Sequence, residues 1–496
     1  MEITLLGFFT IVLSIYAFFK DKKLLLYMMV FLSTFTAANL IHITVTTTPI
    51  LTFEFTGAMW LLREFIDFVK LKPKINKEII KSKLKENKLA IAFLLFIITI
   101  ILGELYLAIS GISIEYVNIL NENAVLAFNK ANITMGIRTI FVFILMIVLS
   151  FKIKTKKEIE ELIKVFCIST IFAVIWGLLQ FITFYFGIPY PAFLFNNNIY
   201  AAQCYDQIEN NIKRITSIAL EPSTFAINLI AFMPFVIGTF LKMKSNFKDK
   251  KYLWIFIIII FTTACAILTT SSTSYIGLVA VYGMFLIYTL IGFIRKGELD
   301  DRKGNFKKIA LLTVVSITLA VVIGFASLKT GYALKTIDYL KDTTKLSEQE
   351  EVEEDYMSVI GNMIKTLKKM TIEKLGSGSG QERMLGERIG FSMLKYSPIF
   401  GLGFTSYRTF SLLTNILVNA GIVGVISYLY IMYVTIKALI KSRKQDETVS
   451  IMFLISIIGM TIAFCVGVPD LLYIYYWIII VLGYKYGTLT EAELKN

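Results

Sequence analysis

The sequence contains few charged residues, few cysteines and a single histidine. Charged side chains make up 17% of the 496 residues, whereas hydrophobic side chains make up 56%. A soluble protein of this length could not bury that much apolar surface in its core. The 4 cysteines are spread along the chain in a pattern that specifies no disulfide framework. These scarcities exclude a soluble enzyme, a disulfide-rich secreted scaffold and a disordered tail protein.

The apolar residues occur in runs of about twenty, which is long enough to cross the hydrocarbon core of a bilayer. This pattern predicts an all-α polytopic membrane protein with about twelve or thirteen spans. The first run lacks a basic leader and a small-residue cleavage site, so we expect a retained helix. The predicted spans are 3–19, 24–45, 50–69, 89–110, 133–151, 162–187, 216–241, 253–271, 273–294, 309–328, 411–436, 449–467 and 470–487.

The positions of the basic residues predict the orientation of the chain. The net charge is +14, but most lysines and arginines cluster in short loops between spans, which is typical of cytoplasmic loops and not of a nucleic-acid site. The loops on one side of the predicted spans hold most of the lysines and arginines, and this side is therefore expected to be cytoplasmic. It follows that the N-terminus is expected outside and the C-terminus in the cytoplasm. We therefore expect transmembrane helices in 1–328, a large extracytoplasmic loop in 329–410, and transmembrane helices with a cytoplasmic tail in 411–496.

The outer loop over 329–410 is too long to be a simple connector. Apolar residues recur at helical spacing over 356–375, with lysines on the opposite face, which predicts an amphipathic helix lying near the membrane surface. A glycine- and serine-rich hinge over 376–380 and a second helix over 382–395 are expected to follow it.

Two ionisable residues, Arg214 and Glu221, lie at the start of the seventh predicted span. An ionisable residue at membrane depth costs about 2.5–3.5 kcal/mol on insertion scales, so it needs a partner or a wet cavity. The spacing would place both residues on one helical face, and Pro222 would open the helix toward a cavity. The alternative interpretation is a structural ion pair at a kinked helix.

A second constellation begins at Arg383, fifteen residues before Pro398. Glycines at 401 and 403 follow that proline and would let backbone amides approach an anion closely. Guanidinium groups grip phosphate in a bidentate way that ammonium groups cannot. For each neighbouring cation the alternative is the solvated face of an outer helix. These neighbouring cations are Arg388, Lys395 and Arg408.

A third motif, Thr414-Asn415 followed by Gly421 and Gly424, opens the eleventh predicted span, and its glycines would permit close helix packing. Together with the Glu-Pro-Ser stretch and a Leu-Thr-Thr-Ser-Ser hairpin at 268–272, the order of these motifs resembles the O-antigen polymerase and O-antigen ligase superfamily over about residues 160–440.

Two departures from that superfamily affect the interpretation. Its ligases usually carry a histidine directly before the asparagine of the last motif, where this chain has Thr414, and the only histidine here is His42. Members also often have Ser-Arg at the outer hairpin, where this chain has Ser271-Ser272. The missing histidine favours the polymerase branch.

The resemblance implies a GT-C-like glycosyltransferase of the bacterial cytoplasmic membrane, with its active site on the outer face. It would join repeat units carried on polyprenyl diphosphate, with such glycans as donor and acceptor. Expected partners are the lipid bilayer, a chain-length regulator and a flippase, with no nucleic acid, cofactor or metal. The alternatives are a ligase that attaches glycan to a lipid or protein acceptor and, from another class, a flippase or transporter of lipid-linked oligosaccharides.

The chemistry of such a reaction assigns candidate roles. A diphosphate leaves as a stable anion, so the enzyme needs fixed positive charge and a carboxylate near the attacking hydroxyl. We expect Glu221 to be the base and Arg214 and Arg383 to hold the diphosphate. The weaker diphosphate candidates are Arg388, Arg408, Arg138 (alternatively an interfacial anchor) and Lys395. The sugar-binding candidates are Tyr200, Asn197, Tyr407 and Asn415, although an interfacial aromatic belt would explain Tyr200 equally well.

Acidic residues give little reason to expect a metal site. They concentrate outside in the run over 348–355, and such a charge run is usually solvated. Asp470 is a lone carboxylate at the start of the last predicted span, and we expect it to cap its helix.

Overall fold

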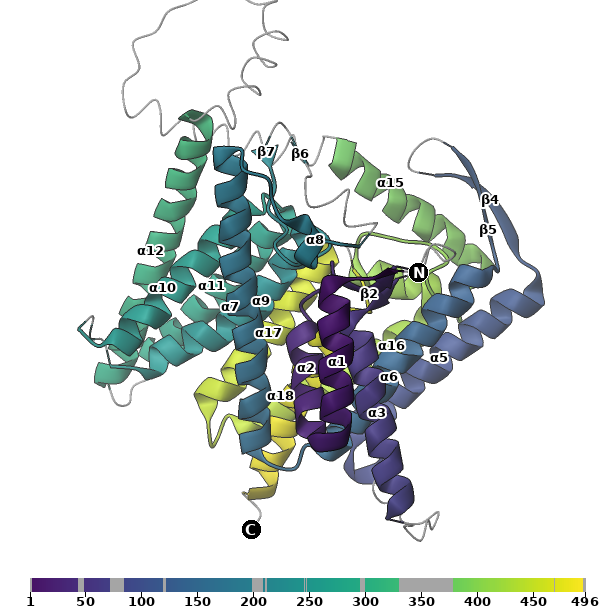
Figure 1. Ribbon diagram of the computed structural model, residues 1–496, viewed down its shortest axis with the longest axis horizontal. Coiled ribbons are helices and arrows are strands. Elements are labelled where there is room, and N and C mark those ends of the chain that lie inside the picture. The colour runs from purple at the N-terminus through teal and green to yellow at the C-terminus, as the bar shows by residue number, and fades with distance from the viewer. Residues whose placement is uncertain are drawn as a thin grey trace, which may run out of the picture.

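The computed structural model describes residues 2–42, 49–71, 84–118, 122–198, 208–209, 212–244, 246, 248–294, 299–329, 378–467 and 469–493. Most of these residues are helical (Figure 1). The helices are α1 (Leu5–Lys20), α2 (Lys22–Leu32), α3 (Thr52–Lys70), α5 (Lys88–Ser110), α6 (Lys130–Lys152), α7 (Lys156–Phe186), α8 (Ala192–Phe195), α9 (Pro222–Lys242), α10 (Lys250–Leu268), α11 (Ser272–Ile294), α12 (Leu299–Lys329), α15 (Gly378–Met393), η2 (Leu394–Tyr396), α16 (Leu412–Ser442), α17 (Glu447–Val466) and α18 (Ile474–Glu493).

The strands are short and form three small antiparallel sheets. One sheet has the order β1-β2-β3, and the other two are hairpins, β4-β5 and β6-β7. These short strands precede or separate the helices, and the described part of the chain remains mostly helical, as the sequence predicts. The strands are β1 (Glu2–Ile3), β2 (Asn39–His42), β3 (Ile50–Leu51), β4 (Ser113–Val117), β5 (Asn123–Ala127), β6 (Ile208–Glu209) and β7 (Ile212–Lys213).

Within the described residues, 9 helices are long and apolar enough to cross a membrane. They confirm the prediction of a multi-pass helical membrane protein. The first predicted span corresponds to α1, a shorter apolar helix. These 9 helices are α5, α6, α7, α9, α10, α11, α12, α16 and α17.

The second predicted span, 24–45, is wrong, because α2 ends at Leu32. Hydroxyl side chains just beyond Leu32 donate to backbone carbonyls in the last turn of α2, and the helix does not continue. The Ser33 hydroxyl donates to the carbonyl of Val30 at 2.6 Å. Short hydroxyl side chains that bond the backbone in this way compete with helix propagation. The apolar run therefore turns and returns as strand β2.

The seventh predicted span is also wrong at its start, since α9 begins at Pro222. The chain from Arg214 to Glu221 is not helical, and Ser217 has a left-handed φ of 55°. The Gln180 side-chain carbonyl of α7 accepts hydrogen bonds from the amides of Thr216 at 2.9 Å and Ser217 at 2.7 Å. Arg214 and Glu221 therefore do not lie on one helical face. Pro222 is the first residue of α9, a favourable position for proline, and it does not kink the helix.

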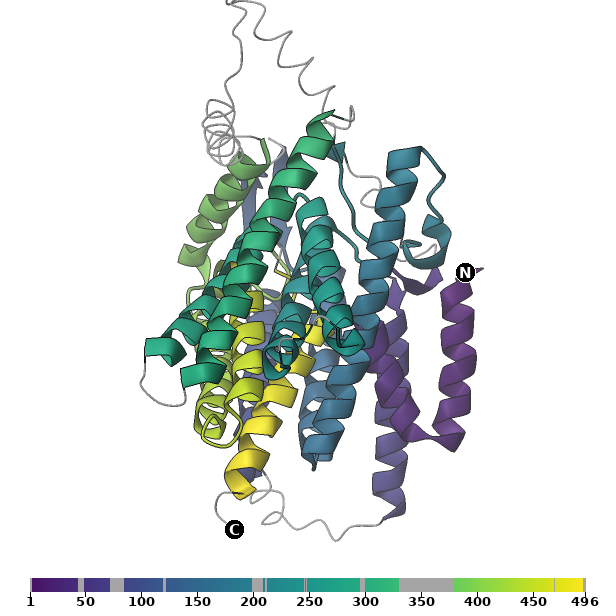
Figure 2. The ribbon, with the colours of Figure 1, turned by 90° about the vertical axis from the view of Figure 1, so that its left-hand side faces the viewer.

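Two other sequence predictions are confirmed. The tight hairpin expected at 268–272 joins α10 to α11. The helix expected over 382–395 corresponds to α15 and η2. The amphipathic helix expected over 356–375 lies outside the described residues. Figures 1 and 2 both place α15 and α8 toward the end of the bundle that lies away from the C-terminus.

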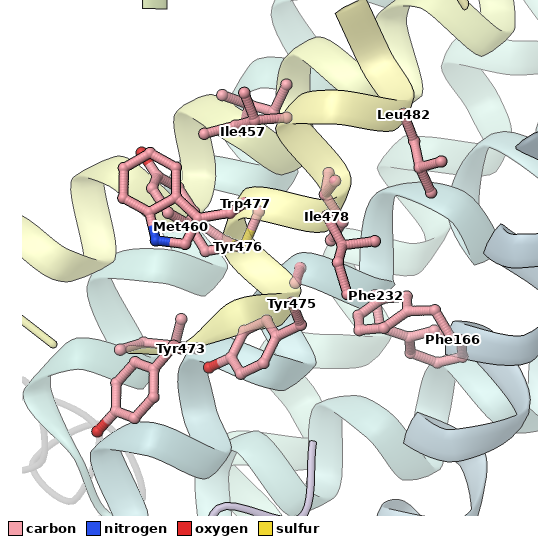
Figure 3. Packing of buried hydrophobic residues seen from close by; sticks show 14 of the residues in the cluster. Phe166, Phe232, Ile457, Met460, Tyr473, Tyr475, Tyr476, Trp477, Ile478 and Leu482 are labelled. Carbon is pink, nitrogen blue, oxygen red and sulfur yellow. The ribbon is translucent and has the colours of Figure 1, made fainter. Parts of the chain in front are cut away.

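The apolar core gathers around α18, which contacts α6, α7, α16 and α17. Figure 3 shows the side chains of this helix interleaved with residues of α7, α9 and α17. Trp477 is fully buried, and its indole nitrogen donates to the carbonyl of Leu471 at 2.7 Å. That bond ties the turn before α18 to the core, which fixes the position of the polar residues in the turn.

Candidate functional site

Helix α16 is broken where the third sequence motif lies. Gly421 has φ 67° and ψ −171° inside the helix, a conformation that only glycine adopts without strain. The amides of Ile422 and Val423 donate to the carbonyls of Pro398 at 3.0 Å and Ile399 at 3.3 Å. The Pro-x-x-Gly-x-Gly motif thus packs into the break of α16. The two sequence motifs are therefore in direct contact in the folded chain.

The loop that follows this motif is held by polar side chains from two helices. The Glu104 carboxylate of α5 accepts a hydrogen bond from the amide of Phe404 at 2.7 Å. The Asn132 amide of α6 donates to the hydroxyl of Ser406 at 2.6 Å. Glu104 was not among the candidates predicted from the sequence, although a carboxylate inside an apolar span is itself a signal of a specific role.

Helix α16 also holds this loop at Tyr407, the residue directly before Arg408. The Asn419 side chain accepts from the amide of Tyr407 at 3.0 Å and donates to its carbonyl at 2.7 Å. The Tyr407 hydroxyl donates to the carbonyl of Gly386 at 3.1 Å, and burial raises the pKa of Tyr407 to about 12. Three helices and α15 therefore determine where Arg408 lies.

Arg408 lies close to Glu221, the carboxylate of the Glu-Pro-Ser motif. Its guanidinium nitrogen Nη2 lies 3.8 Å from Oε1 of Glu221. The other carboxylate oxygen of Glu221 accepts a hydrogen bond from the Ser223 hydroxyl at 3.2 Å. The Arg408 side chain is 62% exposed and that of Glu221 is 27% exposed. This ion pair is accessible and joins segments that are distant in sequence.

Asp470, in the turn between α17 and α18, shares the electrostatic environment of this pair. Its carboxylate accepts a hydrogen bond from the amide of Leu472 at 2.8 Å inside that turn. Because α18 begins only at Ile474, the expectation that Asp470 caps this helix is wrong. Burial is the main cause that raises the pKa of Asp470, and the positive charges of Arg408 and Arg138 oppose that rise. The negative charge of Glu221 adds to it.

Arg138 of α6 is the second cation of this group. Its Nε donates to Oε1 of Glu54 at 2.7 Å, and both side chains are mostly buried. Charges that converge from separate elements at one place can bind and orient an anionic group. We call Glu221, Arg408, Asp470 and Arg138 the charged cluster.

The two arginines that we expected to hold the diphosphate each donate to a backbone carbonyl. Arg214 is 9% exposed, and its Nε donates to the carbonyl of Thr269 at 3.0 Å. Arg383 donates to the carbonyl of Val466 at 3.1 Å and so places a cation at the C-terminal end of α17, where the helix dipole favours it. In the part of the chain that the structure describes, no hydrogen bond or ion pair joins either arginine to Glu221.

The remaining candidates occupy several places. Arg388 and Lys395 are exposed, and the Lys395 amine lies 5.0 Å from the centroid of the Tyr396 ring. The Asn197 side chain accepts from the amide of Asn39 at 2.8 Å, and the Asn415 side chain accepts from that of Asn419 at 3.4 Å. Tyr200 lies outside the described residues. Among the described residues, no group of three His, Cys, Asp or Glu side chains is arranged to hold a metal ion.

Comparison with the models of known protein families gave no match for this chain, and comparison with curated proteins gave none either. The fold and the site therefore define its class by themselves. The chain is a multi-pass helical membrane protein with a cluster of two arginines and two carboxylates, of which Arg408 and Glu221 are accessible.

The raised pKa of Asp470 predicts a pH dependence of stability. A carboxyl group whose pKa is higher in the folded state contributes stability below its unfolded value, and this contribution is lost as the pH rises through the folded value. From about pH 4 upward, wild-type protein should lose stability relative to Asp470→Asn, which does not titrate. Unfolding midpoints measured in detergent across the pH range test this, with the exposed Glu115→Gln as control. Parallel pH profiles for wild type and Asp470→Asn would contradict it.

Proposed function

We propose that this chain is a polysaccharide polymerase that joins repeat units carried on polyprenyl diphosphate at the outer face of a bacterial cytoplasmic membrane. The observation that supports this most strongly is the approach of Arg408 to within 3.8 Å of Glu221. A fixed cation and a carboxylate, both accessible, are the two groups that transfer of a glycosyl group from a diphosphate requires.

The reaction that fits these groups is a single displacement. The acceptor hydroxyl oxygen forms a bond to the anomeric carbon of the donor sugar, while the bond from that carbon to the diphosphate oxygen breaks. The electron pair leaves on the diphosphate, and the hydroxyl proton passes to Glu221. Positive charge on Arg408 and Arg138 stabilises the negative charge that develops on the departing diphosphate as the sugar becomes cation-like in the transition state.

The two arginines expected from the sequence differ in how well they suit this proposal. Arg383 is partly exposed beside the end of α17 and the turn that leads to Asp470, so it fits a contact to the diphosphate or to a second lipid-linked glycan. Arg214 is 9% exposed and bonded to a backbone carbonyl, so a role in holding the hairpin between α10 and α11 suits it better.

The rival class, a transporter of lipid-linked oligosaccharides, has one observation in its favour. Helix α16 is discontinuous at Gly421, and transporters often bind substrates at broken helices. In this chain, however, backbone bonds from residues 398–402 fill the break. A ligase would use the same kind of cluster with a different acceptor, and the test below separates it by its product.

Purified protein in detergent, supplied with lipid-linked repeat units, is expected to lengthen the glycan without a sealed compartment. A transporter cannot do this, and a ligase would transfer finished glycan without lengthening it. Arg383→Ala should lower the elongation rate at least tenfold because a cation near the diphosphate is lost, whereas Arg383→Lys should retain part of it. Failure of the wild type to elongate any such glycan would contradict the polymerase proposal, and full activity of Arg383→Ala would contradict the role of Arg383.

A further inference from the structure

A cavity of about 260 Å³ lies at the other end of α3 and α6 from the charged cluster. On α3, Glu54 contacts the cluster, and Glu64 lines the cavity ten residues later, roughly 15 Å along the helix. Lysines Lys22, Lys23 and Lys152 also line it, and we call it the lysine cavity. It belongs to no part of the proposed catalytic site.

The carboxylates of the lysine cavity already have partners. Glu64 is 7% exposed and forms ion pairs with Lys22 at 3.5 Å and with Lys152. Glu158 accepts hydrogen bonds from the amides of Lys154 at 2.8 Å and Thr155 at 3.0 Å as part of the cap of α7. Both carboxylates in the wall are therefore already paired, which leaves little for a cationic ligand to bind.

The lysines, in contrast, keep unused donors. Each ammonium group has three N–H donors. Lys23 pairs with Glu161 at 2.6 Å and Lys152 pairs with Glu64, so each has donors to spare. The three lysine side chains are 44–50% exposed. The hydrogen-bonding capacity that remains in the cavity is donor capacity, and it suits an anion.

The rest of the wall is apolar and aromatic. Leu26 and Leu162 line the cavity together with Trp60, which is 1% exposed. A free inorganic anion would gain nothing from contact with these side chains, whereas a ligand with an anionic head and an apolar body would use both kinds of wall. We propose that the lysine cavity binds the phosphate headgroup of an anionic phospholipid.

Native mass spectrometry of the full chain with added phosphatidylglycerol or phosphatidylcholine tests this proposal. Phosphatidylglycerol should bind at least tenfold more tightly than phosphatidylcholine. Lys23→Gln should weaken phosphatidylglycerol binding at least tenfold, and Lys23→Arg should preserve it because the cation remains. Lys250→Gln, which changes an exposed lysine at the start of α10, is the matched control and should have no effect.

Three results would overturn the proposal. They are equal binding of the two lipids, unchanged binding by Lys23→Gln, and displacement of the lipid by an equal concentration of inorganic phosphate. The last would assign the cavity to the free anion. Lys23 pairs with a partly exposed carboxylate, so we expect the variant to fold, and its unfolding midpoint in detergent checks this. Lipid binding is measured without turnover, so the result does not depend on the proposed function.

Discussion

Glu221→Gln is expected to lower the rate of glycan elongation at least about 100-fold, the lower end of the range for loss of a general base. The amide has nearly the size of the carboxylate and can still accept a hydrogen bond from the Ser223 hydroxyl, which lies 3.2 Å away. It cannot accept the proton of the attacking hydroxyl, and it carries no charge to pair with Arg408. The rate at which purified protein lengthens lipid-linked glycan measures the effect.

The matched control for this prediction is Glu115→Gln, because Glu115 is an exposed glutamate in strand β4 that takes no part in the charged cluster. That variant should elongate glycan at the wild-type rate. Equal yields of folded protein after purification should show that both variants insert into the membrane. Elongation by Glu221→Gln at more than about a tenth of the wild-type rate would remove Glu221 from the role of base.

Gly421→Ala should destabilise the protein strongly. A Cβ atom at this position would lie 2.0 Å from the carbonyl oxygen of Ile399. The backbone conformation, with φ 67° and ψ −171°, alone costs a residue with a side chain roughly 1–3 kcal/mol. Relief of the overlap would also disrupt the bonds from Ile422 and Val423 to the loop. The thermal unfolding midpoint in detergent should fall well below that of the wild type.

Gly283→Ala provides the comparison within the same protein. Gly283 lies in α11, and a Cβ atom there would meet no atom within 4 Å. Alanine is preferred to glycine inside a helix by about 1 kcal/mol, so this variant should be as stable as the wild type or slightly more stable. If the two variants unfolded at the same temperature, the break in α16 would not be a structural requirement.

The helical class of the fold could be predicted because long apolar runs have few structural solutions in a membrane. The hairpin between α10 and α11 was also predicted correctly, because the polar Thr-Thr-Ser-Ser stretch at 269–272 separates two such runs. The end of α2 was not predictable from hydropathy, because the apolar run continues past Leu32. Hydroxyl side chains such as Ser33 decide the turn there, and their partners are known only once the chain is folded.

The geometry of the candidate site was only partly predictable, again because it depends on contacts that form when the chain folds. The sequence identified Glu221 and Arg408 as candidates, but it assigned Arg214 as the close partner because it assumed a continuous helix. Pro222 is a favourable first helical residue and was a local signal for the actual start of α9. The approach of Arg408 depends on the break at Gly421 and on bonds from Glu104 and Asn419, which are contacts between distant segments.

A double-mutant cycle on Glu221 and Arg408 tests the central claim most directly. The elongation rates of Glu221→Gln, Arg408→Gln and the double variant are compared with that of the wild type. If both side chains act on one transition state, the double variant should be little slower than Glu221→Gln alone, because interacting residues are not additive. Losses that simply multiply would show that the two groups work independently and would contradict a shared catalytic site.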